Sequence, residues 1–181
     1  MGHSIKFRYP RMPTLKSSQL RAFRLAFCLA VFSSVVTNPQ NDSSLATRIE
    51  KALKAKEPDW RYVGAIESGR VPLVPSERRI ITGTWSGPKS RSQDVDIFVY
   101  SVESREEAAA WLRPVRDKRV AEGWQVNVFQ IGDEGYLSKY KNGNRFDIAF
   151  RRGTVVAKLA GDDLDRVREF AHCVVEQIAA N

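Results

Sequence analysis

The sequence predicts an α+β domain in which two or three helices flank a mostly antiparallel sheet of about five to six strands. Between residues 61 and 160, runs rich in Ile, Val, Thr and aromatic residues alternate with turn residues, as strands do. Segments with apolar residues at helical spacing lie before, between and after these runs. With 181 residues, 43 % of them apolar, the chain has room for one modest domain and a leader.

Residues 1–43 are predicted to form a targeting segment. A basic stretch ending at Arg24 precedes the apolar run 25–36, and a polar stretch follows it. The run is shorter than the ~20 residues that span a bilayer and fits the hydrophobic region of a signal peptide. We expect export, to the periplasm or the exterior of a bacterial cell, with residues 25–36 either cleaved off or kept as a membrane anchor. Both alternatives stay open, and translation can begin at Met1 or at Met12.

Charge and residue counts exclude several classes of function. The net charge is +8, but five of these charges lie in residues 1–47, so the remaining domain lacks the basic stripe that nucleic acid binding needs. Two Cys and two His cannot supply a disulfide scaffold, and we expect no metal site and no cofactor. His172 is the single histidine after the leader and diverges from its neighbour Cys173, which argues against a nucleophile–histidine pair.

The predicted domain spans residues 44–181 and begins with a helix. Ser44 caps it, apolar residues recur at helical spacing over 44–56, and a Pro-containing stretch ends it. Residues 60–75 are expected to be irregular chain, because Gly and Pro interrupt them, with room for a short strand at 61–65. Strands are expected at 79–86 and 95–102, and the second of these is expected to be central because both of its faces are apolar.

The middle helix is predicted from a capping box. Ser104 and Glu107 have the spacing of this motif, and Ala108, Trp111 and Leu112 follow on one face. Pro114 lies inside this helix and is expected to kink or divide it.

Four further strands and a last helix complete the predicted domain: 124–131, 136–141, 144–151, 154–160 and 163–180. Turn signals at Asn142–Gly143 and Arg152–Gly153 predict two hairpins with two-residue loops. This register places Asp147 beside Ser138 on one neighbouring strand and across from Lys158 on the other. Phe146, Ile148 and Phe150 then face the helices.

The opposite face of these hairpins is the candidate ligand surface. It concentrates aromatic and charged side chains on a rigid sheet, which suits a small anionic or carbohydrate ligand. The alternative is a solvated face with cross-strand ion pairs of little energetic consequence. The candidate residues are Tyr136, Tyr140, Arg145, Asp147 and Lys158.

Two pairs of carboxylates are candidates for acid–base catalysis. Asp94 and Asp96 lie at the start of a strand, and Asp133 and Glu134 lie in a turn between strands. A solvated strand end and a turn explain them equally well. The acidic run 162–165 is expected to cap the last helix.

The sequence from Ile131 onward carries a family resemblance. Ile131-Gly-Asp-Glu-Gly-Tyr136, followed by Ile148-Ala-Phe-Arg-Arg-Gly-Thr-Val-Val156 and a terminal amphipathic helix, resembles the ending of small exported bacterial domains, including mycobacterial-type lipoproteins and PsbP-like α/β/α sandwiches. The resemblance implies an antiparallel sheet flanked by helices, in accessory or binding modules. The chain departs from the lipoprotein members because Cys28 lies within the apolar run rather than after it.

The sequence therefore favours an exported, noncatalytic accessory or binding module. Its partner is expected to be a protein or a small anionic or carbohydrate ligand, bound by the candidate ligand surface or by the loop 65–78. We expect a monomer that meets the membrane only through its N-terminal segment. The alternative is a small exported hydrolase that uses the acidic pairs.

Overall fold

The computed structural model describes residues 39–64, 72–88 and 94–179. The chain divides into two units, Met1–Val36 and Thr37–Asn181, and all described residues belong to the second. The predicted export run 25–36 lies outside the described residues, as does the loop segment 65–71. Among the helices of the described part, none has the length and apolar character needed to cross a bilayer.

Seven strands form one sheet, in the order β1-β2-β3-β7-β6-β5-β4, and every neighbouring pair is antiparallel. The α+β class is confirmed. The sheet is larger than the expected five to six strands because the short segment within 61–65 also joins it, as an edge strand. The elements are α2 (Pro39–Lys56), β1 (Arg61–Gly64), β2 (Arg78–Ser86), β3 (Val95–Ser101), α3 (Arg105–Ala121), β4 (Gln125–Val128), β5 (Glu134–Lys139), β6 (Phe146–Arg152), β7 (Val155–Gly161) and α4 (Leu164–Ala179).

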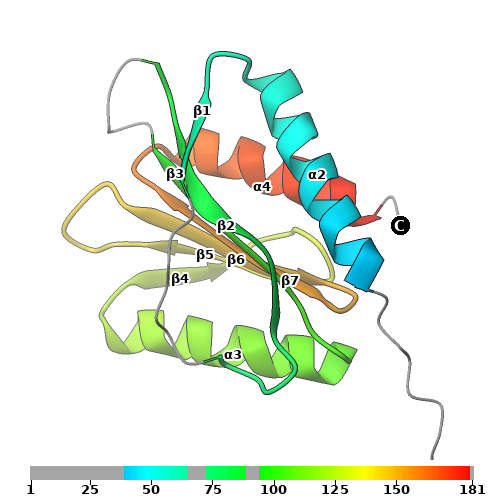
Figure 1. Ribbon diagram of the computed structural model, residues 1–181. Helices are drawn as coiled ribbons and strands as arrows, with labels where there is room; N and C mark the ends of the chain where they lie inside the picture. The colour runs from blue at the N-terminus through cyan, green and yellow to red at the C-terminus, as the bar shows by residue number, and fades with distance from the viewer. Residues whose placement is uncertain (1–38, 65–71, 89–93, 180–181) are drawn as a thin grey trace, which may run out of the picture. The chain divides into compact units, whose positions relative to one another are not determined.

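The helices cover the two faces of the sheet unequally (Figure 1). On one face, α2 and α4 enclose the larger core, built around side chains such as Leu53, Ile97 and Phe170. On the other face, α3 encloses a smaller core around Trp111 and Val156. Apolar side chains alternate along β3 so that both faces of this strand are buried, which confirms its predicted central position.

Two helix predictions need correction. α2 begins at Pro39 rather than at Ser44, because proline at a first helical position has no N–H to satisfy and a fixed φ that suits the helix. α3 continues through Pro114 as one helix of 17 residues instead of dividing there. The predicted cap is confirmed, because Ser104 Oγ accepts a hydrogen bond from Glu107 N at 3.1 Å.

The hairpin register is confirmed on one side of β6 and wrong on the other. Asp147 pairs with Ser138 on β5, as Asn142–Gly143 predicted. On β7 it pairs with Ala160, not with Lys158, because the loop is Gly153–Thr154 and starts one residue later than predicted. Gly153 has φ 59°, and a glycine at the first loop position is what a type II′ turn requires. Each β6 residue thus pairs two positions further along β7 than predicted, and a shift of two leaves every side chain on its predicted face of the sheet.

Cys173 corrects a further expectation. Its position on α4, away from the stripe that faces the sheet, predicts at least partial exposure, yet it is only 5 % exposed. α2 packs alongside α4 and covers this second side, and Arg48 Nη2 on α2 donates to Gln177 O on α4 at 3.1 Å. Burial also raises the pKa of the Cys173 thiol, which disfavours the reactive thiolate.

Candidate functional site

The predicted ligand surface is not one solvated face. Tyr140, Arg145, Asp147 and Lys158 come from β6, β7 and the β5–β6 turn, on the side of the sheet that faces α3. Asp147 is buried beneath the end of α3 and is only 2 % exposed. Tyr136 lies toward the other end of β5, in a separate group of contacts with Glu134 and with α3.

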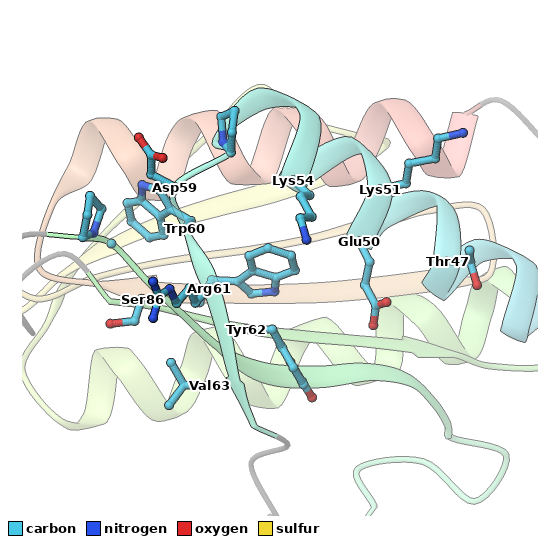
Figure 2. A pocket seen from close by; sticks show the side chains of 14 residues that line it. Thr47, Glu50, Lys51, Lys54, Asp59, Trp60, Arg61, Tyr62, Val63 and Ser86 are labelled. Atoms are coloured by element: carbon cyan, nitrogen blue, oxygen red, sulfur yellow. The ribbon is translucent and has the colours of Figure 1, made fainter.

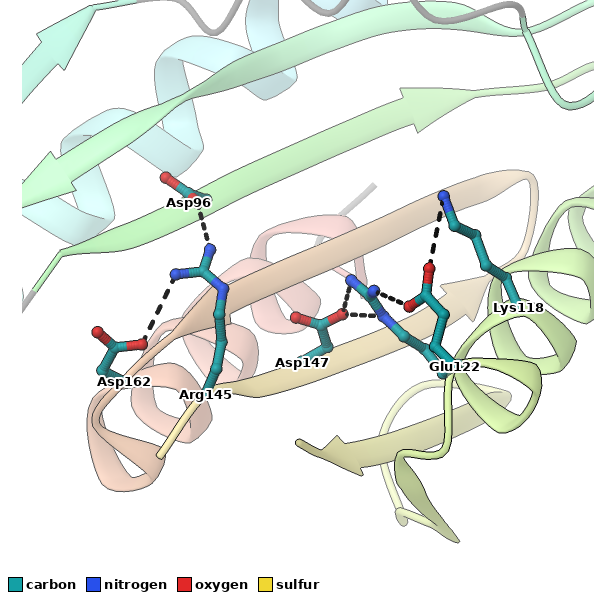
Figure 3. Close-up of polar contacts among 7 residues, drawn as sticks. Asp96, Lys118, Glu122, Arg145, Asp147 and Asp162 are labelled. Carbon is teal, nitrogen blue, oxygen red and sulfur yellow. Dashed lines mark hydrogen bonds and ion pairs between the residues drawn. The ribbon is translucent and has the colours of Figure 1, made fainter. Parts of the chain in front are cut away.

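Asp147 is held by Arg119 from the last turn of α3 (Figure 3). Arg119 Nε donates to Asp147 Oδ2 at 2.6 Å, and Nη2 forms an ion pair with the same oxygen. Arg119 also donates to Glu122 at 2.7 Å, and its guanidinium lies 4.1 Å from the centroid of the Trp124 ring. Arg119 thus engages Asp147 Oδ2 in a contact between helix and sheet, while Asp147 Oδ1 is buried without a hydrogen-bond partner among the described residues.

Arg145 forms a second, exposed group (Figure 3). Arg145 Nη2 donates to Asp96 Oδ2 on β3 at 2.8 Å, and its Nη1 lies 3.6 Å from Asp162 before α4. With 46 % of its side chain exposed, this pairing has little energetic weight.

Lys158 is half-buried between these two groups. Its ammonium lies 5.2 Å from the centroid of the Phe98 ring and forms no ion pair with a described acid, because Asp147 and Asp96 are already held by arginines. Burial lowers the pKa of Lys158, and the nearby arginines lower it further, whereas the two carboxylates oppose them. The predicted residues thus form a largely closed network, in which Lys158 alone is left without a counter-charge.

The candidate acid–base pairs are also engaged. Thr84 Oγ1 donates to Asp96 Oδ1 at 2.8 Å, and Ser86 Oγ donates to Asp94 Oδ1 at 2.5 Å. Within the described residues, no group of three His, Cys, Asp or Glu side chains is placed to hold a metal ion.

The pKa of the Glu134 carboxyl is shifted in the direction opposite to that of a general acid. Hydrogen bonds from the Tyr136 hydroxyl at 2.7 Å and from Arg151 Nε at 3.0 Å lower the pKa of its carboxyl. The same contact raises the pKa of Tyr136. A general acid in a hydrolase needs a raised carboxyl pKa, so this cluster favours structural pairing.

A cleft that the sequence did not predict lies between α2 and the edge strand β1 (Figure 2). It has a volume of about 1250 Å³. We call it the α2–β1 cleft; α2, β1, the start of the 57–60 turn and the end of β2 line it. Figure 2 shows Glu50 and Lys54 extending from α2 toward β1, and Tyr62 extending from β1.

The floor of the α2–β1 cleft is aromatic. The Tyr62 ring lies across β2 at Gly83, where a Cβ atom would come within 2.2 Å of Tyr62 Cε2, and the Tyr62 hydroxyl donates to Thr82 O at 3.1 Å. The Trp85 ring meets Tyr62 edge-on with centroids 6.0 Å apart. Gly83 therefore provides the close approach that seats Tyr62 on the sheet.

Polar groups around this floor have no partner among the described residues. Trp85 is 4 % exposed, and its Nε1 is buried with no hydrogen-bond acceptor. The charged side chains of the lining also form no ion pair with another described residue: Glu50, Lys51, Lys54, Asp59 and Arg61. The charged side chains are therefore available to a ligand in the cleft, whereas the Trp85 N–H is enclosed by protein.

This site is hard to predict from the sequence, because the apolar surroundings of Trp60 and Trp85 along the chain favour an interpretation as core residues. Both are buried, so that interpretation is correct for most of each ring. The available signal was Gly83 inside a strand, which often marks the close approach of another group. Comparison of the chain with protein-family models and with curated proteins gave no match.

Proposed function

We propose that this protein is an exported, noncatalytic binding module of the cell envelope, and that the α2–β1 cleft is its ligand site. A cleft of about 1250 Å³ with an aromatic floor, lined by charged side chains that form no ion pair with another described residue, is the observation that carries the proposal. Ligand sites combine concave apolar walls with a few unsatisfied polar groups, and the α2–β1 cleft has both.

The hydrolase alternative has less support. A carboxylate pair that acts as acid and base needs one raised pKa and free access to a substrate. The structure instead engages Asp94, Asp96 and Glu134 with hydroxyl or guanidinium donors. The α2–β1 cleft contains Glu50 and Asp59, but the described residues that line it include no histidine.

Site-directed photo-cross-linking in living cells tests the binding site. A photoreactive phenylalanine analogue replaces Val63, which lines the cleft and is 66 % exposed, or Val128 on the opposite edge strand as the matched control. We expect a cross-linked product of the envelope fraction from position 63 that is absent from position 128. Equal products from both positions, or none from position 63, would contradict the proposed site.

Export is tested separately with a fusion protein. Residues 1–47 joined to alkaline phosphatase, which needs disulfides that form outside the bacterial cytosol, should give active enzyme. Deletion of 25–36 from the same fusion should abolish the activity. An inactive full-length fusion would show that the N-terminal segment does not direct export.

A further inference from the structure

We infer that the α2–β1 cleft binds an extended peptide segment of a partner protein, which adds to the sheet as an eighth strand along β1. This inference rests on the proposed function and specifies its ligand. It follows from the position of the cleft at an open edge of the sheet, from the chemistry of the cleft floor and from the charges of the cleft lining.

The first observation is the open edge. Within the described part of the chain, β1 is the last strand of the sheet on its side and pairs only with β2, so one side of its backbone faces away from the sheet. Its residues Arg61, Tyr62 and Val63 are exposed. Unpaired N–H and C=O groups along an edge strand match the backbone of another extended chain, and such strand addition is a recurring mode of peptide recognition.

The second observation is the helix beside this edge. α2 lies alongside β1 and, together with it, lines the cleft (Figure 2). A strand that pairs with β1 would direct every second side chain to the face that carries α2, because strand side chains alternate with a period of two. A segment whose backbone pairs with β1 would therefore place alternate side chains in the cleft.

The third observation specifies those side chains. The floor consists of the Tyr62 and Trp85 rings, which suit an apolar side chain. The lining carries charges of both signs without an ion pair to another described residue, and among them Lys54 extends from α2 toward β1 (Figure 2). We expect a segment with an apolar residue and, two positions away, an acidic residue within reach of Lys54.

Selection from an unbiased library tests the sequence preference. Random twelve-residue peptides displayed on phage are selected on the full chain, and the strongest binder is synthesised. We expect the apolar-x-acidic pattern to be enriched. The affinity should fall at least about tenfold with Lys54→Glu and stay unchanged with Lys141→Glu, a matched reversal in the exposed β5–β6 turn. Failure to enrich any peptide, or equal losses with both variants, would overturn the inference.

Backbone measurements distinguish strand addition from any other binding in the cleft. With the synthesised peptide bound, the amides of Arg61–Gly64 should become protected from hydrogen exchange, and those of the other edge strand, Gln125–Val128, should not. N-methylation of the peptide should abolish binding at alternate residues and be tolerated at those between them, since only alternate N–H groups face the partner strand. Binding without either pattern would overturn strand addition.

The outcomes separate this inference from the proposed function. A cross-link from position 63 to a carbohydrate or a small molecule would support the proposed binding module and contradict the inference that its ligand is a peptide. Concentration-dependent dimers of the full chain that Val63→Pro abolishes would identify a second copy as the occupant of the edge, and would also overturn the partner peptide.

Discussion

The α3-covered face of the sheet and the α2–β1 cleft contain similar residue types and differ in how these residues are satisfied. On the α3-covered face, Asp147 and Asp96 are each paired with an arginine. In the cleft, Lys54 and Glu50 form no ion pair with another described residue, whereas both regions contain a buried polar atom without a hydrogen-bond partner, Asp147 Oδ1 and Trp85 Nε1. Charged residues on a strand therefore indicate a ligand site only when the fold leaves them without partners of their own.

The largest loss of stability should come from a substitution that introduces a charge into the core between these two regions. Ile148 is fully buried between the sheet and α4, so Ile148→Asp should cost about 5 kcal/mol or more, comparable with the whole stability of a domain. Loss of the cooperative urea transition is the expected result. Val128→Asp, at a side chain 72 % exposed, should leave the transition within about 0.5 kcal/mol. A folded Ile148→Asp variant would show that β6 does not have this register.

The second prediction addresses the paired region itself. Asp147→Ala leaves the Arg119 guanidinium, which is 18 % exposed, without its main counter-charge and should destabilise the domain by about 3 kcal/mol. Arg145→Ala removes an exposed ion pair and should cost less than about 1 kcal/mol. Urea denaturation of both variants measures the difference. Equal losses would show that Asp147 is not part of a buried contact.

The fold was largely predictable because its signals are local. Alternation along β3, the cap at Ser104 and the turn at Asn142–Gly143 each follow from a few adjacent residues. The Gly153–Thr154 loop differs by one residue from the predicted one, because Arg-Gly and Gly-Thr are both acceptable two-residue loops and the sequence does not choose between them.

The candidate site was less predictable because it depends on which helix covers which face. The predicted polar surface required α3 to leave Asp147 open, and instead Arg119 reaches it from 28 residues away. Exposure of Cys173 required α4 to have one buried side, and α2 provides a second. The cleft combines α2 with β1 and β2, and no single stretch of sequence contains these three elements together.

A third prediction concerns the floor of the cleft. Gly83→Ala places a methyl group against the Tyr62 ring, which must swing outward and lose its hydrogen bond to Thr82 O. Overpacking of this kind should cost about 1 kcal/mol, because Tyr62 is 44 % exposed and can move. In a double-mutant cycle with Tyr62→Ala, the two changes should be non-additive, since removal of the ring removes the clash. Additive losses would mean that Tyr62 is not seated on Gly83.

The smallest effect should be a change in the pH dependence of stability caused by Lys158. Burial lowers the pKa of this lysine in the folded domain, so below the folded pKa both states hold the proton and the cost of burying the ammonium is fully present. As the pH rises from the folded pKa toward the ordinary lysine pKa of ~10.4, the folded state releases its proton first. The unfolded state then binds more protons, and stability rises with pH by linkage.

Lys158→Met removes this contribution. Across this alkaline range, the free energy of unfolding of the wild type should therefore increase relative to that of the variant. Asp147, Asp96, Arg119 and Arg145, which surround the ammonium, are present in both proteins. Parallel curves from urea denaturation across this range would show that the Lys158 ammonium is hydrated, and that the α3-covered face is as open as the α2–β1 cleft.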